Sequence, residues 1–84
     1  MSIINEREKT HGPYRDTAVW SQSLKEKFRN SPNWSKLNEQ QKEALEMIAL
    51  KLSRLLNGDP NFADHLIDIG GYVELYISNM NPAP

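Results

Sequence analysis

The feature that most constrains this fold is a long helical pattern between residues 38 and 58. Asn38, followed three residues later by Gln41, forms a capping-box pattern that marks a helix start. Asn57-Gly58 supplies residues that favour the left-handed conformation found at helix ends. Between them the apolar residues recur at intervals of three and four, which predicts a helix whose core stripe is Leu45, Ile48, Ala49, Leu52, Leu55 and Leu56.

A second helix is predicted over residues 14–29. Pro13 suits a helix start, and the residues after it recur at the same intervals, namely Thr17, Trp20, Leu24 and Phe28.

A third helix is predicted after a tight turn at residues 58–61. Asp59 is a candidate cap, Pro60 would take the first helical position, and the helix would run to about residue 79. Its predicted core stripe is Phe62, Leu66, Ile69, Val73, Ile77 and Met80. Gly70-Gly71 in its middle costs about 1 kcal/mol per glycine relative to alanine. Close approach of another helix or of a ligand would offset that cost.

These patterns predict an all-α fold, a compact three-helix unit whose last two helices form an antiparallel hairpin. We expect a flexible arm at residues 1–9, a single helical domain at 10–79 and a flexible tail at 80–84. A chain of 84 residues buries only about 60 to 65% of its unfolded surface, so we expect a homo-oligomer. The candidate contacts between subunits or with a partner are Met47 and Leu50, which lie off the core stripe, and Gly70 and Gly71.

The composition excludes several classes of protein. Without cysteine there is no disulfide framework, no thiolate zinc site and no thiol nucleophile. The first residues, MSIINEREK, carry charges where a signal peptide needs apolar residues, and no apolar stretch is long enough for a membrane helix. A net charge of -1 does not favour long nucleic acids. We therefore expect a cytoplasmic protein that binds neither membranes nor long nucleic acids.

The small net charge conceals a strong asymmetry along the chain. Residues 1–58 carry all ten Lys and Arg against seven acids, a net of +3, whereas residues 59–84 carry four acids and no Lys or Arg. This division favours assembly, with the basic part of one subunit facing the acidic third helix of another.

The predicted hairpin places charged residues of its two helices level with each other. Counting outward from the turn puts Lys51 beside Asp68, and Arg54 beside Asp64 and His65. The pattern fits an ion-pair ladder that fixes the register of the hairpin. It also fits a polar pocket in which Lys51, Arg54 and His65 bind a phosphate.

Two aromatic side chains extend the pocket hypothesis. His11, in the segment THGPY, either packs locally or points into the same pocket as His65. Tyr72 offers a surface on which a base could stack. The candidate ligand-binding residues are therefore His11, Lys51, Arg54, Asp64, His65, Asp68 and Tyr72.

A magnesium site is the alternative chemistry. Glu39, Glu43 and Glu46 share one helix face and, with Asp64 and Asp68, resemble the acidic clusters of all-helical nucleotide pyrophosphohydrolases. Because that face points nearly opposite the core stripe, a solvated helix face is the better interpretation. We expect no catalytic residues, metal or cofactor, with Mg²⁺ as the alternative.

Several segments together resemble a known family. THGPY, NW, LNEQQKEALEMIALKLSRLLNGDP and DHLIDIGGYVEL, within residues 10–76, are similar to short phage and prophage proteins classed as a domain of unknown function. The resemblance implies a phage-encoded accessory protein acting in the host bacterial cytoplasm.

Three functional hypotheses follow. The first is a nucleotide-binding protein that sequesters a host antiviral signalling nucleotide, a sponge rather than an enzyme. The second is a magnesium-dependent nucleotide pyrophosphohydrolase. The third is a protein inhibitor of a host defence enzyme, with Met47 and Leu50 in its contact surface.

Overall fold

The computed structural model describes residues 3–80, which are helical with short connections and contain no strand. The elements are α1 (Ile3–His11), α2 (Tyr14–Arg29), the short 3₁₀ helix η1 (Trp34–Lys36), α3 (Glu39–Asn57) and α4 (Ala63–Ser78). None of these helices is long and apolar enough to cross a membrane. The all-α prediction is confirmed, whereas residues 1–2 of the predicted arm and 81–84 of the predicted tail lie outside the described residues.

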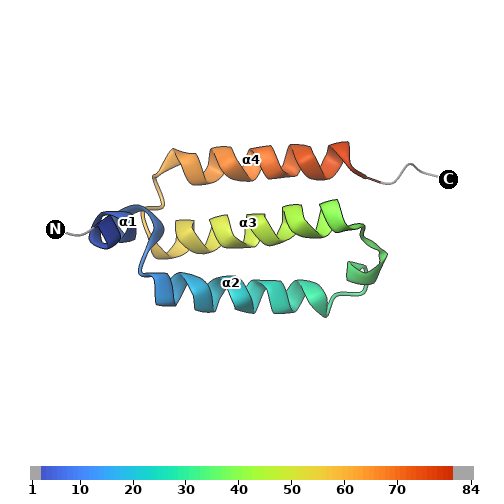
Figure 1. Cartoon of the computed structure of the whole chain (residues 1–84), viewed down its shortest axis with the longest axis horizontal. Helices are drawn as coiled ribbons and strands as arrows, with labels where there is room; N and C mark the ends of the chain where they lie inside the picture. The colour runs from blue at the N-terminus through green and yellow to red at the C-terminus, as the bar shows by residue number, and fades with distance from the viewer. Residues whose placement is uncertain (1–2, 81–84) are drawn as a thin grey trace.

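The three long helices lie side by side in a single layer with α3 in the middle (Figure 1). Helix α3 contacts both α2 and α4, and α1 lies across the end of the layer where α2 begins and α3 ends. The antiparallel pairing of α3 and α4 confirms the predicted hairpin.

Helix α3 begins and ends as its sequence predicts. The side chain of Asn38 accepts a hydrogen bond from the backbone N–H of Gln41, and the side chain of Gln41 accepts one from the backbone N–H of Asn38, both at 2.8 Å. This capping box satisfies donors that the first turn would otherwise leave free. Asn38 also donates to the backbone oxygen of Asn79, at 2.8 Å, and so ties the start of α3 to the end of α4.

Helix α4 begins at Ala63, three residues later than the sequence predicted. The side chain of Asp59 accepts a hydrogen bond from the backbone N–H of Asn61, at 2.9 Å. This local bond holds Pro60 and Asn61 in a turn, as aspartate side chains commonly do. Pro60 therefore precedes the helix instead of occupying its first position.

The first helix was not predicted, because residues 3–11 lack the apolar spacing of an amphipathic helix. Its position depends on backbone contacts at its C-terminal end. The carbonyl oxygen of Thr10 accepts a hydrogen bond from the backbone N–H of Asp59, at 3.1 Å. Such a tertiary backbone contact leaves no periodic signal in the sequence.

The predicted core stripe of α4 is wrong for the single chain. Its members Leu66, Val73, Ile77 and Met80 are exposed, whereas His65 is buried and Tyr72 and Tyr76 are half-buried. In a layer one helix thick, an outer helix buries only the side that faces its neighbour. The only fully buried hydrophobic residues among those described are Ala44 and Ala49 of α3.

Candidate functional site

The two turns at one end of the layer are locked together through glycines. Gly12 has φ 79°, in the left-handed region, and a Cβ there would lie 2.5 Å from the carbonyl oxygen of Asn57. A Cβ on Gly58 would meet the carbonyl oxygen of Thr10. Only glycine allows the backbones to approach this closely. The segments THGP and NGDP are therefore the two sides of one contact that fixes α1 against the α3–α4 turn.

His65 completes this junction from α4. It is only 1% exposed, and its Nε2 donates a hydrogen bond to the carbonyl oxygen of Thr10, at 2.7 Å. Its ring lies 5.0 Å from the ring of Phe62 and 5.2 Å from that of His11, measured between centroids. His65 therefore joins α4 to α1, and its Nε2 is already engaged by the protein.

His11 is the polar group at the junction that still has an unpaired atom. Its Nδ1 is buried without a hydrogen-bond partner, while its backbone oxygen accepts from the hydroxyl of Thr17, at 2.8 Å. Burial lowers the pKa of His11 below 6.5, and the positive charge of Arg54 lowers it further, with smaller effects from His65, Arg7 and Lys51. The imidazole is therefore neutral near pH 7, and its buried Nδ1 has no partner among the described residues.

A cavity of about 550 Å³ lies beside His11, between α1, α2 and α3. Arg7 of α1, Lys25 of α2 and Arg54 of α3 line it. The ion pairs found within residues 3–80 are Arg29–Glu46 and Lys51–Asp68, so none of these three cations is neutralised by such a pair. The remaining lining residues are Glu8, Gly12, Tyr14, Thr17, Ala18, Ser21, Gln22 and Leu50. We call this cavity the basic cavity.

The structure brings only two of the seven predicted ligand residues, His11 and Arg54, to the basic cavity. Lys51 and Asp68 pair with each other, with Nζ and Oδ2 2.8 Å apart, which confirms the predicted hairpin register. The hydrogen bond from Lys51 lowers the pKa of the Asp68 carboxyl below 3.8. Asp64 is exposed and forms no ion pair with Arg54 in the described part of the chain.

Tyr72 lies at a second, smaller cavity. This cavity, of about 370 Å³, is lined by Glu39, Gln40, Glu43 and Ala44 of α3 and by Tyr72, Leu75 and Asn79 at α4 and its end. Its charged groups are carboxylates, so Tyr72 is separated from the cations with which the sequence grouped it.

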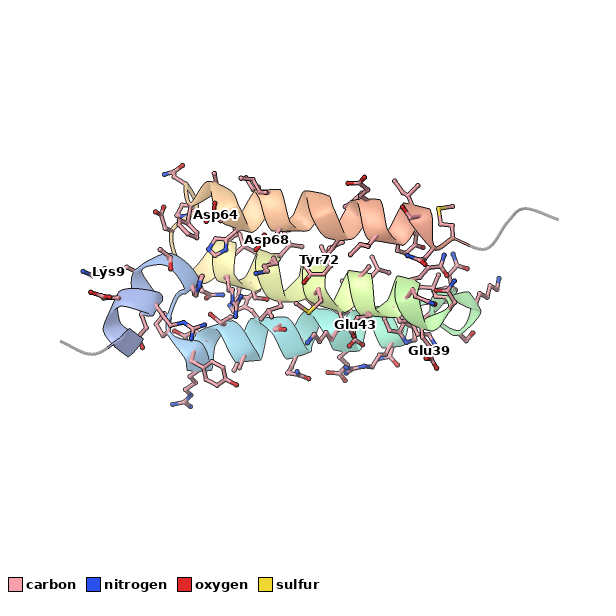
Figure 2. All side chains as sticks on the ribbon, turned by 45° about the horizontal axis from the view of Figure 1, so that its top comes forward. Lys9, Glu39, Glu43, Asp64, Asp68 and Tyr72 are labelled. Carbon is pink, nitrogen blue, oxygen red and sulfur yellow. The ribbon has the colours of Figure 1, made fainter. Side chains whose placement is uncertain are left out.

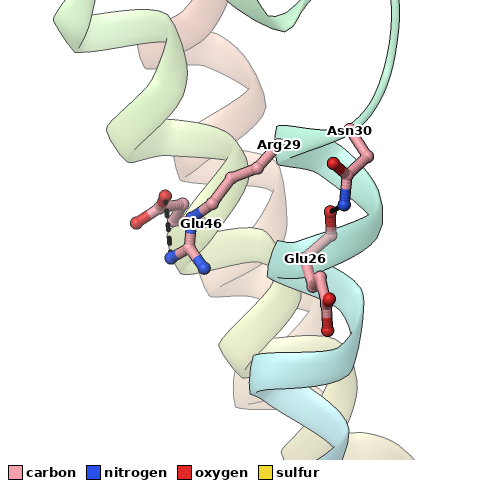
Figure 3. A network of polar contacts seen from close by, with 4 residues as sticks. All are labelled: Glu26, Arg29, Asn30 and Glu46. Atoms are coloured by element: carbon pink, nitrogen blue, oxygen red, sulfur yellow. Dashed lines mark hydrogen bonds and ion pairs between the residues drawn. The ribbon is translucent and has the colours of Figure 1, made fainter.

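The five acids of the magnesium alternative do not converge within one chain. Asp64 and Asp68 lie near the α1 end of the layer, whereas Glu39 and Glu43 lie near the other end (Figure 2). Glu46 faces α2, where its carboxylate lies 3.6 Å from the guanidinium of Arg29 (Figure 3). Among the described residues, no group of three or more His, Asp or Glu is placed to hold a metal ion.

The four predicted contact residues lie in different surroundings. Leu50 lines the basic cavity, and Met47 is half-buried. Gly70 and Gly71 are exposed, and no atom of the described residues outside their own helical turns lies within 4 Å of the position that a Cβ would take on either. The described part of the chain therefore supplies no close contact that explains the glycine pair.

Sequence reasoning missed Arg7, Tyr14 and Lys25 as cavity residues. Arg7 fell in the segment predicted to be a flexible arm, and Lys25 lies on the polar side of its helix, where lysine is ordinarily solvated. The THGPY segment was the available signal, since it contains both His11 and Tyr14.

Comparison with known proteins identifies a family. The model of a domain of unknown function, DUF6378, matches residues 1–79. No curated protein and no solved structure is significantly similar to the chain. Because the match covers nearly the whole sequence, the chain belongs to the DUF6378 family.

Proposed function

We propose that the protein binds a phosphate-bearing nucleotide in the basic cavity. The observation that carries this proposal is the meeting of Arg7, Lys25 and Arg54, from three different helices, around one cavity without ion-pair partners among the described residues. Like charges gathered in this way repel each other, and an anion between them removes that repulsion. At about 550 Å³ the cavity is within the range of about 300 to 1,000 Å³ typical of small-molecule sites.

Different side chains of the basic cavity suit different parts of a nucleotide. Arginine binds phosphate oxygens through two parallel hydrogen bonds, a role suited to Arg7 and Arg54, and Lys25 adds a point charge. His11 also lines the cavity, and its buried Nδ1 has no partner among the described residues, which makes this side chain a further candidate contact. Tyr14, which is 83% exposed at the cavity, offers a ring on which a base can stack.

We further propose that binding serves to sequester the ligand. The resemblance to short phage proteins favours a host antiviral signalling nucleotide as that ligand and the host bacterial cytoplasm as the place of action. The cavity supplies cations and hydrogen-bonding groups that hold an anion, which is what sequestration needs. We also propose that the chain works as a homo-oligomer.

Isothermal titration calorimetry with cyclic and linear nucleotides tests this proposal. We expect binding at micromolar concentrations or tighter, and at least about a tenfold loss in Arg54→Gln, because a charge-assisted hydrogen bond is worth about 1.5–3 kcal/mol. Arg15→Gln is the matched control, since Arg15 is an exposed arginine on α2 that does not line the cavity. Absence of binding by every nucleotide, or equal losses in both variants, would contradict the proposal.

The same samples separate the two alternatives. A magnesium-dependent pyrophosphohydrolase would release pyrophosphate from nucleoside triphosphates, and chelation of the metal would stop the reaction. A protein inhibitor that uses Met47 would lose its partner in Met47→Asp while nucleotide affinity stayed the same.

A further inference from the structure

One side of the helical layer is apolar across all three long helices. Successive residues of an α-helix are rotated by about 100° around the helix axis. Around their own axes, Leu52 of α3 therefore lies about 160° from Arg54, and Trp20 of α2 lies about 140° from Lys25. On α4, Leu66 lies about 180° from Leu75. Arg54 and Lys25 line the basic cavity and Leu75 lines the smaller cavity, so both cavities open on the opposite side. The apolar face consists of Trp20, Leu24, Leu45, Leu52, Leu56, Leu66, Val73 and Ile77.

The apolar face is poorly covered by the chain itself. Trp20 is 49% exposed, Leu56 62%, Leu66 55% and Ile77 62%. Burying such side chains stabilises a protein in proportion to the apolar area removed from water. With Ala44 and Ala49 as the only buried hydrophobic residues described, the single chain gains little from its own core. A partner that covers this face would therefore stabilise the chain.

We propose that a second copy of the chain covers this face. Two layers stack through their apolar faces about a two-fold axis parallel to α3. This axis places each α3 on the α3 of the other copy, and each α2 on the other copy's α4.

Net charge favours this arrangement over the alternative, in which α2 packs on the other copy's α2 and α4 on the other copy's α4. Outside the ion pairs Arg29–Glu46 and Lys51–Asp68, α2 carries three Lys and Arg against two acids, a net of +1, whereas α4 carries two acids and no Lys or Arg, a net of -2. Stacking α2 on the other copy's α4 brings helices of opposite net charge near each other at both edges, with Lys25, on the cavity side of α2, acting only at longer range. An axis running across the helices would instead place α2 on α2 and α4 on α4, with like charges facing.

The dimensions and the glycine pair fit the same interface. Helix α3 has 19 residues and is therefore about 28 Å long, and the molecule is 24 Å wide across the layer. That footprint suits a standard interface, which buries about 800 Å² per partner. Gly70 lies on α4 between Leu66, Val73 and Ile77, with open space above it, so a helix of the second copy can approach closely there.

Sedimentation and thermal unfolding of the full chain test the proposal. Each chain has a mass of 9.7 kDa, and we expect twice that mass at micromolar concentrations, with a melting temperature that rises with concentration. Leu66→Gln combined with Val73→Gln should lower both the mass and the melting temperature. Leu75→Gln is the matched control, because Leu66 and Leu75 are 55% and 54% exposed on opposite sides of the same helix. A folded monomer whose melting temperature is independent of concentration would overturn the proposal.

Single cysteines determine the orientation without relying on a destabilised variant. The chain has no cysteine, so Leu45→Cys or Leu52→Cys introduces the only thiol. A two-fold axis along α3 brings each of these positions next to its own copy, and both variants should form disulfide-linked dimers under mild oxidation. Met47→Cys, on the other side of α3, should not. Crosslinking through Met47→Cys, or through neither apolar-face variant, contradicts the proposed interface.

Nucleotide binding and dimer formation can fail separately. The basic cavity opens on the side of the layer away from the apolar face. A dimer that binds no nucleotide would therefore overturn the proposed nucleotide binding and leave the interface standing. A nucleotide-binding monomer would overturn the interface and the proposed homo-oligomer and leave nucleotide binding standing.

Discussion

The imidazole Nε2 of His65 lies 2.7 Å from the carbonyl oxygen of Thr10 and ties α4 to the end of α1. The carbonyl of Thr10 also accepts the backbone N–H of Asp59, so this one oxygen joins three segments of the chain. The same junction positions Arg7 and His11 at the basic cavity. A structural histidine thus supports the cavity without lining it.

His65→Ala should destabilise the protein by about 2–4 kcal/mol, because it removes a buried hydrogen bond and leaves a cavity. Asp64→Ala, at the neighbouring exposed position, should cost less than about 1 kcal/mol, the value of an acid in the first turn of a helix. Urea denaturation measures both changes. Equal effects would show that the histidine contact contributes little.

Gly12→Ala should destabilise the protein by more than about 1–2 kcal/mol, because alanine must adopt φ 79° and its Cβ would lie 2.5 Å from the oxygen of Asn57. Gly71→Ala should instead stabilise it by up to about 1 kcal/mol, since Gly71 is in a helix with open space around it. Thermal unfolding of the two variants gives the comparison. A neutral Gly12→Ala would contradict the locked junction.

Asp68→Asn should lower stability at neutral pH and have progressively less effect in acid. The hydrogen bond from Lys51 lowers the pKa of Asp68 in the folded chain below its ordinary value of 3.8. Stability from this carboxylate is therefore present above pH 3.8 and is lost as the pH falls through the pKa of the folded state. Melting temperatures of both proteins between pH 2 and pH 7 should converge at the acid end. A constant difference would show that the charge of Asp68 is unimportant.

Nucleotide binding should become tighter as the pH falls from 8 to 5.5. Burial and nearby cations lower the pKa of His11 in the free protein, and a bound phosphate would raise it by favouring the imidazolium. Binding would then be coupled to proton uptake at His11. A cyclic nucleotide is the appropriate probe, because its phosphodiester does not titrate in this range. Calorimetry in buffers of different ionisation enthalpy counts the protons taken up.

His11→Asn provides the control for this proton coupling. Asparagine keeps a hydrogen-bonding side chain of similar reach and cannot titrate. The affinity of this variant for the cyclic nucleotide should be independent of pH, because its side chain at position 11 does not titrate. A pH dependence that persists in His11→Asn would contradict proton uptake at His11.

The sequence by itself determined the three long helices, the capping box of α3 and the pairing of Lys51 with Asp68. These features depend on contacts three or four residues apart, or on level positions in a hairpin, so spacing along the chain encodes them. The sequence also shows the apolar spacing of α4. Spacing alone does not show whether these apolar residues pack against the same chain or against a second one.

Only the tertiary structure decided which polar residues meet. In the structure the three long helices form a single layer, the aliphatic stripe of α4 is exposed, and His65 is buried instead. It also brought Arg7, Lys25 and Arg54 together from three helices. These outcomes depend on the contact between the turns at Gly12 and Gly58, and on which side of each helix packs against the neighbouring helix. The contacts that set them join residues far apart in the chain, so no local pattern records them.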